Sequence, residues 1–271
     1  MSQDSITRFL IDSAHVRGEV VRLCDSWQAI LRRADYPQSV RNLLGEAVAA
    51  TALLAETIKF DGSLTLQVRG AGQIELLVVQ VTADNTLRGM AKCAEVVTGE
   101  TLQELLGDGQ MAITIEMGEG KQDYQGIVPL QGERLQDAIQ GYFENSEQLP
   151  TRVWLTADEQ SVAGLFLQKL PGEDAEDETD HWERMTLLAG TVKDEELQTL
   201  DADRLLYRLF NEEEVRARYS IDATQLNDLL ALTGDTTNHL PGVKGIGIKT
   251  ATDLLTQYQD LDTLLIQLPE L

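Results

Sequence analysis

Residues 62–82 read GSLTLQVRGAGQIELLVVQVT and predict the first two strands of an antiparallel β-sheet. In the first half, Leu64, Leu66 and Val68 alternate with polar residues, which is the period of a strand with one buried face. The second half, 74–81, is almost continuously apolar, which is typical of a strand buried on both faces. Only Gly70-Ala71-Gly72 separates the halves, and a connection this short cannot hold a helical crossover.

The region 62–130 is therefore the centre of the expected fold, with helices covering its sheet. Its remaining strands are expected at 87–97, 112–117 and 124–130. Helices are expected over 39–59, capped by Ser39 with one apolar stripe, over 101–106 and over 134–145. A strand at 16–23 and a hairpin at 151–156 and 164–170 complete the domain. The predicted fold class is α+β: a mainly antiparallel sheet packed with helices, then a helical linker and a small all-α tail.

Composition restricts the classes of function. The formal net charge of −23 argues against a mainly nucleic-acid-binding surface, because phosphate contacts need clustered lysine and arginine. There is no long apolar run and no cleavable signal, so we expect a cytoplasmic protein with no membrane contact. Cys24 and Cys93 are too few for a disulfide framework or a zinc site, and we expect two reduced thiols.

The chain divides by composition into three parts. The core domain is expected at 1–172, and Pro171-Gly172 closes it. An acidic and helical linker follows at 173–217, beginning with six acids within nine residues. Its helices carry too few apolar residues for a separate core, so we expect them to rest on the first domain. A tail at 218–271 ends the chain.

The tail contains the strongest local motif of the sequence. Gly242 to Lys249 is glycine-rich and lies between two short helical patterns, the arrangement of a helix-hairpin-helix. Its glycines let the backbone approach a phosphate, and the next helix offers free N–H groups. The predicted contacts to a DNA backbone are Gly245, Ile246, Gly247, Ile248, Lys249 and Thr250. A tight turn between helices is the alternative, and the seven acids and two lysines of residues 219–271 favour that alternative.

The first 218 residues show no signature of an enzyme. There is no nucleophile elbow, and the spacing supports no histidine–carboxylate constellation. His15, His181 and His239 are more typical of surface or capping residues than of catalysts. We therefore predict no catalytic residue.

Residues 1–216 resemble the thirty-three-kilodalton chaperonin family, a redox-regulated holdase of bacteria. The resemblance is carried by Val16-Arg17-Gly18-Glu19, Tyr36-Pro37, Lys59-Phe60-Asp61-Gly62, Tyr124-Gln125-Gly126-Ile127-Val128, Ser146-Glu147-Gln148-Leu149-Pro150-Thr151, Leu206-Tyr207-Arg208-Leu209-Phe210 and Glu212-Glu213-Glu214-Val215-Arg216. It implies an α+β core, a helical linker, ATP-independent binding of unfolded proteins and a role in stress. The family continues into a zinc domain with four cysteines, but this chain has no cysteine after Cys93. The zinc site and the disulfide switch therefore do not carry over.

Residues 218–271 resemble the helix-three-turn-helix module of the 5′-3′ exonuclease and flap endonuclease family. The match runs through Leu230-Ala231-Leu232-Thr233-Gly234-Asp235 and through Pro241-Gly242-Val243-Lys244-Gly245-Ile246-Gly247-Ile248-Lys249-Thr250-Ala251. The resemblance implies a DNA-backbone grip, with a potassium ion held by the carbonyls of Leu232, Thr233, Pro241, Val243 and Ile246. Asn238 stands where many members have a second aspartate, and the nuclease domain with its carboxylate cluster is missing, which argues against nuclease activity. The chain thus resembles a chimera joined near residues 216–219.

Two functions from different classes follow. The first is a holdase chaperone that binds unfolded clients without ATP or redox control, through apolar surface where the linker helices at 187–209 rest on the sheet. The alternative is a sequence-independent DNA-binding protein that uses the tail. The expected partners are unfolded proteins and weakly bound duplex DNA, and a homodimer is left open.

Overall fold

The structure, a computed structural model, describes residues 4–11, 14–58, 60–118, 120–146, 148–171, 176–210, 225–234 and 241–267. It forms two compact units, one of residues 1–172 and 194–199 and one of residues 173–193 and 200–271. The middle helix of the predicted linker, at 194–199, therefore groups with the core, whereas the helices on either side of it group with the tail. The division into core, linker and tail stays a prediction.

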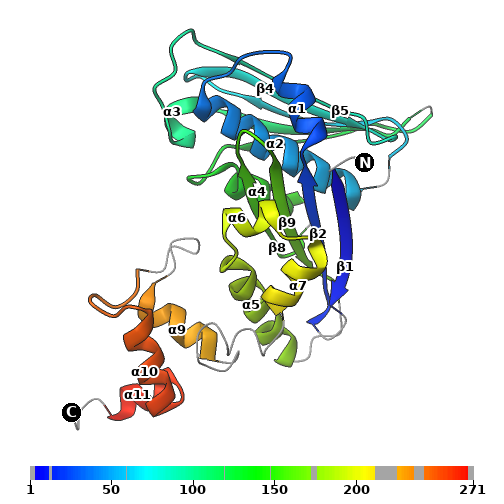
Figure 1. Ribbon diagram of the computed structural model, residues 1–271. Helices are drawn as coiled ribbons and strands as arrows, with labels where there is room; N and C mark the ends of the chain where they lie inside the picture. The colour runs from blue at the N-terminus through cyan, green and yellow to red at the C-terminus, as the bar shows by residue number, and fades with distance from the viewer. Residues whose placement is uncertain are drawn as a thin grey trace. The chain divides into compact units, whose positions relative to one another are not determined.

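The first unit combines two antiparallel sheets with helices, which confirms the α+β class (Figure 1). Its elements are β1 Ser5–Ile11, β2 Val16–Leu23, α1 Asp25–Leu31, α2 Gln38–Thr57, β3 Ser63–Arg69, β4 Ile74–Thr82, β5 Leu87–Cys93, α3 Leu102–Leu106, β6 Gln110–Glu116, β7 Tyr124–Pro129, α4 Leu135–Ser146, β8 Thr151–Ala157, β9 Val162–Lys169 and α6 Asp194–Thr199. The central region forms a five-stranded sheet in the order β5-β4-β3-β6-β7. The hairpin β8–β9 joins β2 and β1 in a four-stranded sheet of order β1-β2-β9-β8, which the sequence did not indicate.

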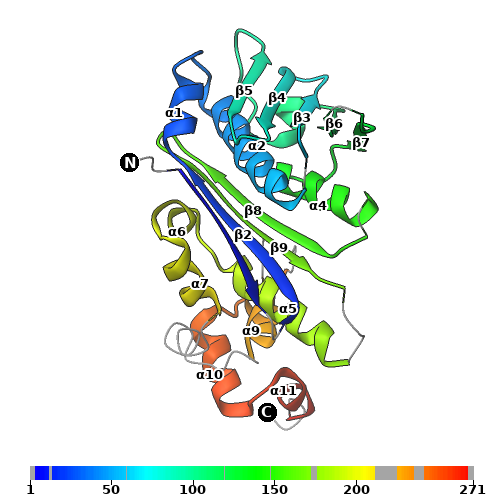
Figure 2. The ribbon, with the colours of Figure 1, turned by 90° about the vertical axis from the view of Figure 1, so that its right-hand side faces the viewer.

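Helix α2 lies between the two sheets and contacts both of them (Figure 2). The predicted single apolar stripe is wrong, because the helix is buried all round from Ala47 to Leu54. Alanine and glycine suit this position because both sheets approach the helix closely. The predicted cap is also wrong: Pro37, which has no side-chain acceptor, precedes the helix in place of Ser39. Neither α2 nor any other helix in the described residues has the length and apolar character needed to cross a membrane.

Strand β4 is buried mainly on one face. Ile74, Leu77, Val79 and Val81 are buried, whereas the residues between them are only half-buried or exposed. The predicted strand with two buried faces is therefore corrected: the other face of the five-stranded sheet carries polar side chains such as Gln80.

The second unit contains helices and no strand among its described residues. Its elements are α5 Glu176–Gly190, α7 Ala202–Phe210, α9 Leu226–Thr233, α10 Ile248–Tyr258 and α11 Leu261–Gln267. Helix α5 packs against α7 and α9, and α10 packs against α9 and α11. Arg208 of α7 donates from Nη2 to the carbonyl of Thr191, just beyond the end of α5, at 2.9 Å. The expectation that linker helices rest on the first domain therefore applies to α6, whereas α5 and α7 pack against each other.

Candidate functional site

The four-stranded sheet is apolar on both faces. The strand register places Val21, Leu23, Val162 and Phe166 on the face toward α2. The opposite face, which we call the outer face, carries Val16, Val20, Trp154, Leu165 and Leu167, each at most 8% exposed. A sheet face of this composition needs a cover in water.

Helix α6 lies on the outer face. It contacts β8 and β9, and Arg22 Nη1 donates to the carbonyl of Thr199 at the helix end, at 3.4 Å. Leu197 is the sole apolar residue in the sequence of this helix, and it is 1% exposed. Burial of one leucine contributes about 1.5–3 kcal/mol. The helix is therefore a weakly attached cover over an apolar surface.

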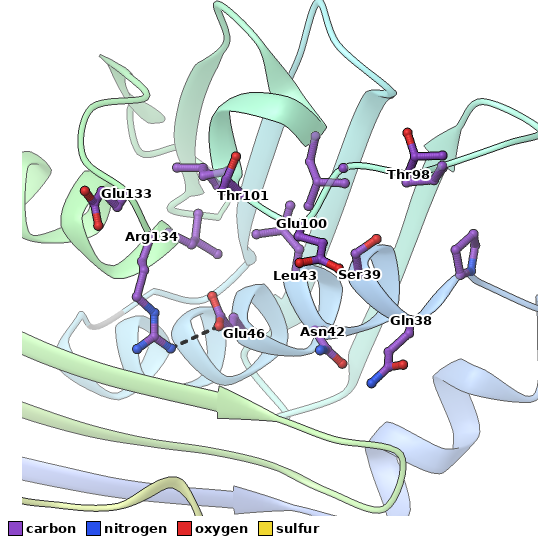
Figure 3. Close-up of a pocket in the computed structure, with 16 residues that line it drawn as sticks. Gln38, Ser39, Asn42, Leu43, Glu46, Thr98, Glu100, Thr101, Glu133 and Arg134 are labelled. Atoms are coloured by element: carbon purple, nitrogen blue, oxygen red, sulfur yellow. Dashed lines mark hydrogen bonds and ion pairs between the residues drawn. The ribbon is translucent and has the colours of Figure 1, made fainter.

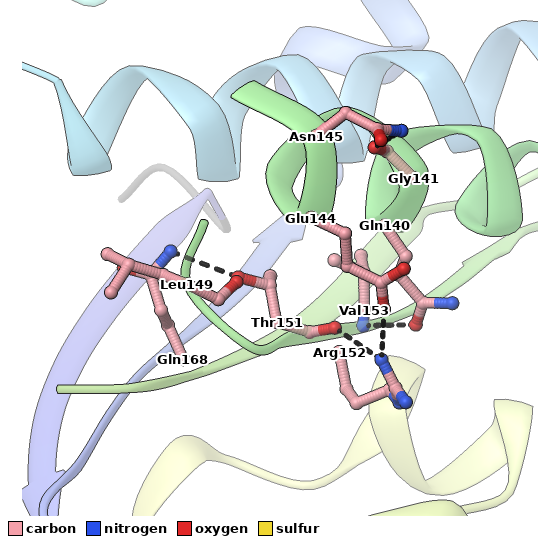
Figure 4. A network of polar contacts seen from close by, with 9 residues as sticks. All are labelled: Gln140, Gly141, Glu144, Asn145, Leu149, Thr151, Arg152, Val153 and Gln168. Atoms are coloured by element: carbon pink, nitrogen blue, oxygen red, sulfur yellow. Dashed lines mark hydrogen bonds and ion pairs between the residues drawn. The ribbon is translucent and has the colours of Figure 1, made fainter. Parts of the chain in front are cut away.

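Polar contacts fix β8 at the edge of this sheet (Figure 4). Gln140 of α4 accepts the backbone N–H of Val153 at Oε1, at 2.9 Å. Glu144 of the same helix pairs with Arg152 Nη1 at 3.1 Å. These side chains occupy part of the edge that another chain could otherwise pair with.

On the α2 side of β2, Glu19 is a buried carboxyl group, 4% exposed. Its Oε2 has no hydrogen-bond partner among the described residues. Burial raises its pKa to about 7, and nearby Arg17 opposes the shift. The group is therefore partly protonated near neutral pH.

The C-terminal hairpin brings the six predicted phosphate-contact residues together at an exposed helix start. Gly245 has φ of 89°, which favours glycine, and it lies three positions before α10 begins. Gly247 caps α10 without a side-chain hydrogen bond, and the first turn holds no acidic residue. Lys249 and its two neighbours 248 and 250 are exposed. Uncapped N–H groups at a helix start favour an anion.

The structure also brings together the five residues that the resemblance assigns to potassium. Leu232 and Thr233 end α9, and the Leu232 carbonyl accepts the N–H of Val243 at 2.8 Å. The Val243 carbonyl in turn accepts the N–H of Ile246 at 3.0 Å. Each of these carbonyls keeps a second lone pair, and uncharged carbonyl oxygens suit a potassium ion. Asp235 and Asn238 lie outside the described residues.

Cysteines and histidines form no common site in the described part of the chain. Cys24 lies between β2 and α1 and Cys93 ends β5, and both are half-buried free thiols. His15 is exposed and His181 lies on α5, whereas His239 is outside the described residues. No group of three potential metal-ligating side chains occurs within the described ranges.

Sequence comparisons identify relatives for both parts of the chain. A family model for Hsp33 protein matches residues 4–225. The chain belongs to the Hsp33 family. A second family model, for the C-terminal SAM fold of 5′-3′ exonucleases, matches residues 221–271 of this Hsp33-family chain. The composite character predicted from the sequence is confirmed.

Individual relatives cover most of the chain. The 33 kDa chaperonin of Nitrosococcus oceani is 51% identical over 215 residues, covering 79% of this chain and 73% of the relative. The 33 kDa chaperonin of Vibrio vulnificus is 37% identical over 265 residues, covering 88% and 90%. A solved structure of the 33 kDa chaperonin from Thermotoga maritima matches with a TM-score of 0.65 at 18% identity, covering 93% of this chain and 97% of that one, and supports the fold. These relatives carry the name of a chaperone and not of an enzyme.

Reasoning from sequence placed the apolar surface where the linker helices at 187–209 rest on the sheet, and α6 does lie on the outer face, but the strands that form this face were not identified. The signal was present in two short apolar runs, 153–155 and 162–167. Continuous apolar runs of this length indicate strands buried on both faces, and hence a second layer over the sheet.

Proposed function

We propose that this Hsp33-family chain is a cytoplasmic stress chaperone that holds unfolded proteins without ATP and without a zinc–thiol switch. The observation that carries the proposal is the apolar outer face beneath α6, in a family whose relatives are named chaperonins. Apolar surface is non-directional, so it accepts many client sequences. A cover attached by one leucine can be displaced at low cost.

The test measures light scattering while a denatured enzyme is diluted into buffer with an equimolar amount of the full chain. We expect slower aggregation, with no change when ATP is added. Leu197→Ala weakens the α6 cover and should suppress aggregation at a lower molar ratio. Glu195→Ala, an exposed substitution in the same helix, is the matched control and should behave as the parent does. A parent chain that leaves aggregation unchanged would sink the proposal.

A second candidate function, sequence-independent contact with duplex DNA, is supported by the hairpin geometry. A Cβ added at Gly247 would meet no atom within 4 Å, and the backbone there is extended, so Gly247→Ala leaves the fold intact. The added methyl would hold a phosphate away from the helix start. Gly245 is a poorer test because its positive φ makes any substitution strained.

Binding can be followed by the fluorescence anisotropy of a labelled duplex at low salt. We expect Gly247→Ala and Lys249→Ala to weaken binding, whereas Lys121→Ala, which removes an exposed lysine of the first unit, should not. With two lysines near the hairpin, the slope of log K against log salt should be about −2. Replacing potassium by sodium should weaken binding if the hairpin carbonyls hold the ion. If the parent and Gly247→Ala bind the duplex equally well, the hairpin is only a structural turn.

A further inference from the structure

A cavity of about 790 Å³ opens in the first unit, between the first half of α2, the segment leading into α3 and the start of α4 (Figure 3). Neither the outer face nor the hairpin contributes to it. Its volume lies within the range of sites that take small organic groups.

The walls of this cavity are fixed by side chains that bond the backbone. Gln73 Oε1 accepts the N–H groups of Thr98 and Gly99 at 2.8 and 3.0 Å. Asp137 Oδ2 accepts the N–H groups of residues 133 and 134, both at 2.9 Å. Thr101 and Glu104 form a capping box at the start of α3. The cavity is therefore preformed and does not need to be ordered by a ligand.

The lining combines an apolar floor with an excess of negative charge. Four leucines, each at most 7% exposed, form the floor: Leu43, Leu102, Leu105 and Leu135. The charged members are three carboxylates and one guanidinium: Glu46, Glu100, Glu133 and Arg134. A cation with an aliphatic stem satisfies both features at once.

Glu46 is the innermost of these charges, with a side chain that is 17% exposed. Its partner is Arg134, whose Nη2 lies 3.3 Å from Oε1. The same Nη2 also donates to the carbonyl of Leu155 at 3.0 Å, so the guanidinium is shared. Burial raises the pKa of Glu46 and Arg134 only opposes that shift, which indicates a carboxylate that Arg134 does not fully compensate.

Two amide side chains of α2 make no hydrogen bond with the described residues. Gln38 and Asn42 lie on the same side of α2 and line the cavity (Figure 3). Asn42 lies one turn from Glu46, so its oxygen can accept an N–H group of a cation bound at Glu46, whereas Gln38 lies two turns away.

We propose that this cavity binds a guanidinium or primary ammonium group on an aliphatic stem, with the head at Glu46 and the stem on the leucine floor. The group can come from a free alkylamine or from a basic side chain of an unfolded protein. The proposal does not depend on the outer face or on the hairpin.

Isothermal titration of the full chain with butylguanidinium tests it, with neutral butylurea as the isosteric control. We expect butylurea to bind at least about tenfold more weakly, because a neutral head leaves the carboxylate uncompensated. Glu46→Gln should lose the preference for the charged probe. Glu75→Gln removes an exposed carboxylate from β4, outside the cavity, and should keep the preference for the charged probe. Equal binding of both probes, or an unchanged preference in Glu46→Gln, overturns the proposal.

Arg134→Ala supplies an independent test, because it removes the guanidinium group that contacts Glu46. Butylguanidinium should then bind more tightly than to the parent and raise the melting temperature of the variant. Arg134→Lys, which keeps a cation, should show a smaller gain and serves if the alanine variant does not fold. If neither variant binds butylguanidinium more tightly than the parent does, the proposal is contradicted.

The source of the cation is distinguished by comparing spermidine with a blocked Leu-Arg-Leu peptide. Tighter binding of the peptide, lost in Glu46→Gln, identifies a basic side chain of an unfolded protein. Tighter binding of spermidine, with the same dependence, identifies a free amine. Binding of neither probe overturns the inference.

Discussion

Burial of Glu19 makes the free energy of unfolding depend on pH. Both nearby arginines have other partners: Arg8 lies 3.7 Å from Glu56, and Arg17 donates from Nε to Gln168 at 2.9 Å. Burial raises the pKa of the carboxyl group to about 7, from an ordinary value of 4.5, so it keeps its proton at pH values where a free glutamate has lost it. Between these values the folded chain holds a proton that the unfolded chain releases, so stability falls as pH rises.

We expect the parent to lose about 3 kcal/mol of stability from this group between pH 4.5 and 7, with no further loss above. Glu19→Gln removes this dependence and should be more stable than the parent at pH 8, with a smaller difference at pH 5. Urea unfolding at both pH values measures it, with Glu75→Gln as an exposed control. A difference between the parent and Glu19→Gln that is the same at both pH values contradicts the assignment.

Individual capping residues were the least predictable feature of the sequence. The start of α1 is capped by Asp4, the residue that precedes β1. Its carboxylate accepts the N–H groups of residues 24, 25 and 26, at 2.7 to 3.0 Å. A cap supplied from 20 to 22 positions away leaves no local signal, whereas α3, whose capping box at Thr101 is local, was placed correctly.

At the scale of elements, two helical glycines should respond to alanine with opposite signs. A Cβ at Gly45 of α2 would overlap the Cβ of Ala157 and lie 2.8 Å from Cγ1 of Val162. A Cβ at Gly141 of α4 would meet no atom within 4 Å. We expect Gly45→Ala to lose about 1–3 kcal/mol by overpacking, because a sheet on each side prevents α2 from moving away.

Gly141→Ala should gain about 0.5–1 kcal/mol, because alanine costs less backbone entropy in a helix. Thermal unfolding of both variants measures the contrast. If both variants were more stable than the parent, α2 would have to be able to shift between the sheets.

Strands with one face exposed to solvent were predicted well. Strands whose pattern depends on their position in the sheet were predicted poorly. Alternation located β3 because its polar residues face solvent. The apolar run in β4 was misread because an apolar residue on an open sheet face looks the same in sequence as a buried one. Strand β1 was missed because it is an edge strand with a half-buried pattern. Assignment of hairpins to two sheets depends on pairings far apart in sequence, which periodicity does not contain.

At the scale of the whole molecule, the chain carries only two cysteines, one before α1 and one at the end of β5. We therefore expect suppression of aggregation to be unchanged by peroxide or by a zinc chelator. The variant with Cys24→Ser and Cys93→Ser should match the parent under both treatments. A peroxide effect that dithiothreitol reverses, and that the double variant lacks, would show a thiol switch.

The composite organisation and the family of each part were predictable because both motif sets are local in sequence. The candidate sites were less so. The hairpin residues follow one another along the chain, but the outer face combines strands from 16–23 with strands from 151–169. The cavity at Glu46 joins three segments spread over about a hundred positions, and no single motif records it.

The pairing of β2 with β9 also affects how the chain is made. Strand β2 leaves the ribosome early, but its partner ends at Lys169. At 5–20 residues per second, roughly 7–30 s of synthesis separate the two. Until then β1 and β2 form at most an isolated hairpin, which is marginally stable in water and has an open edge. Because of this high contact order, the nascent chain is itself prone to aggregate until β9 has been made. Fewer ribosomes per message would make encounters between such nascent chains less frequent.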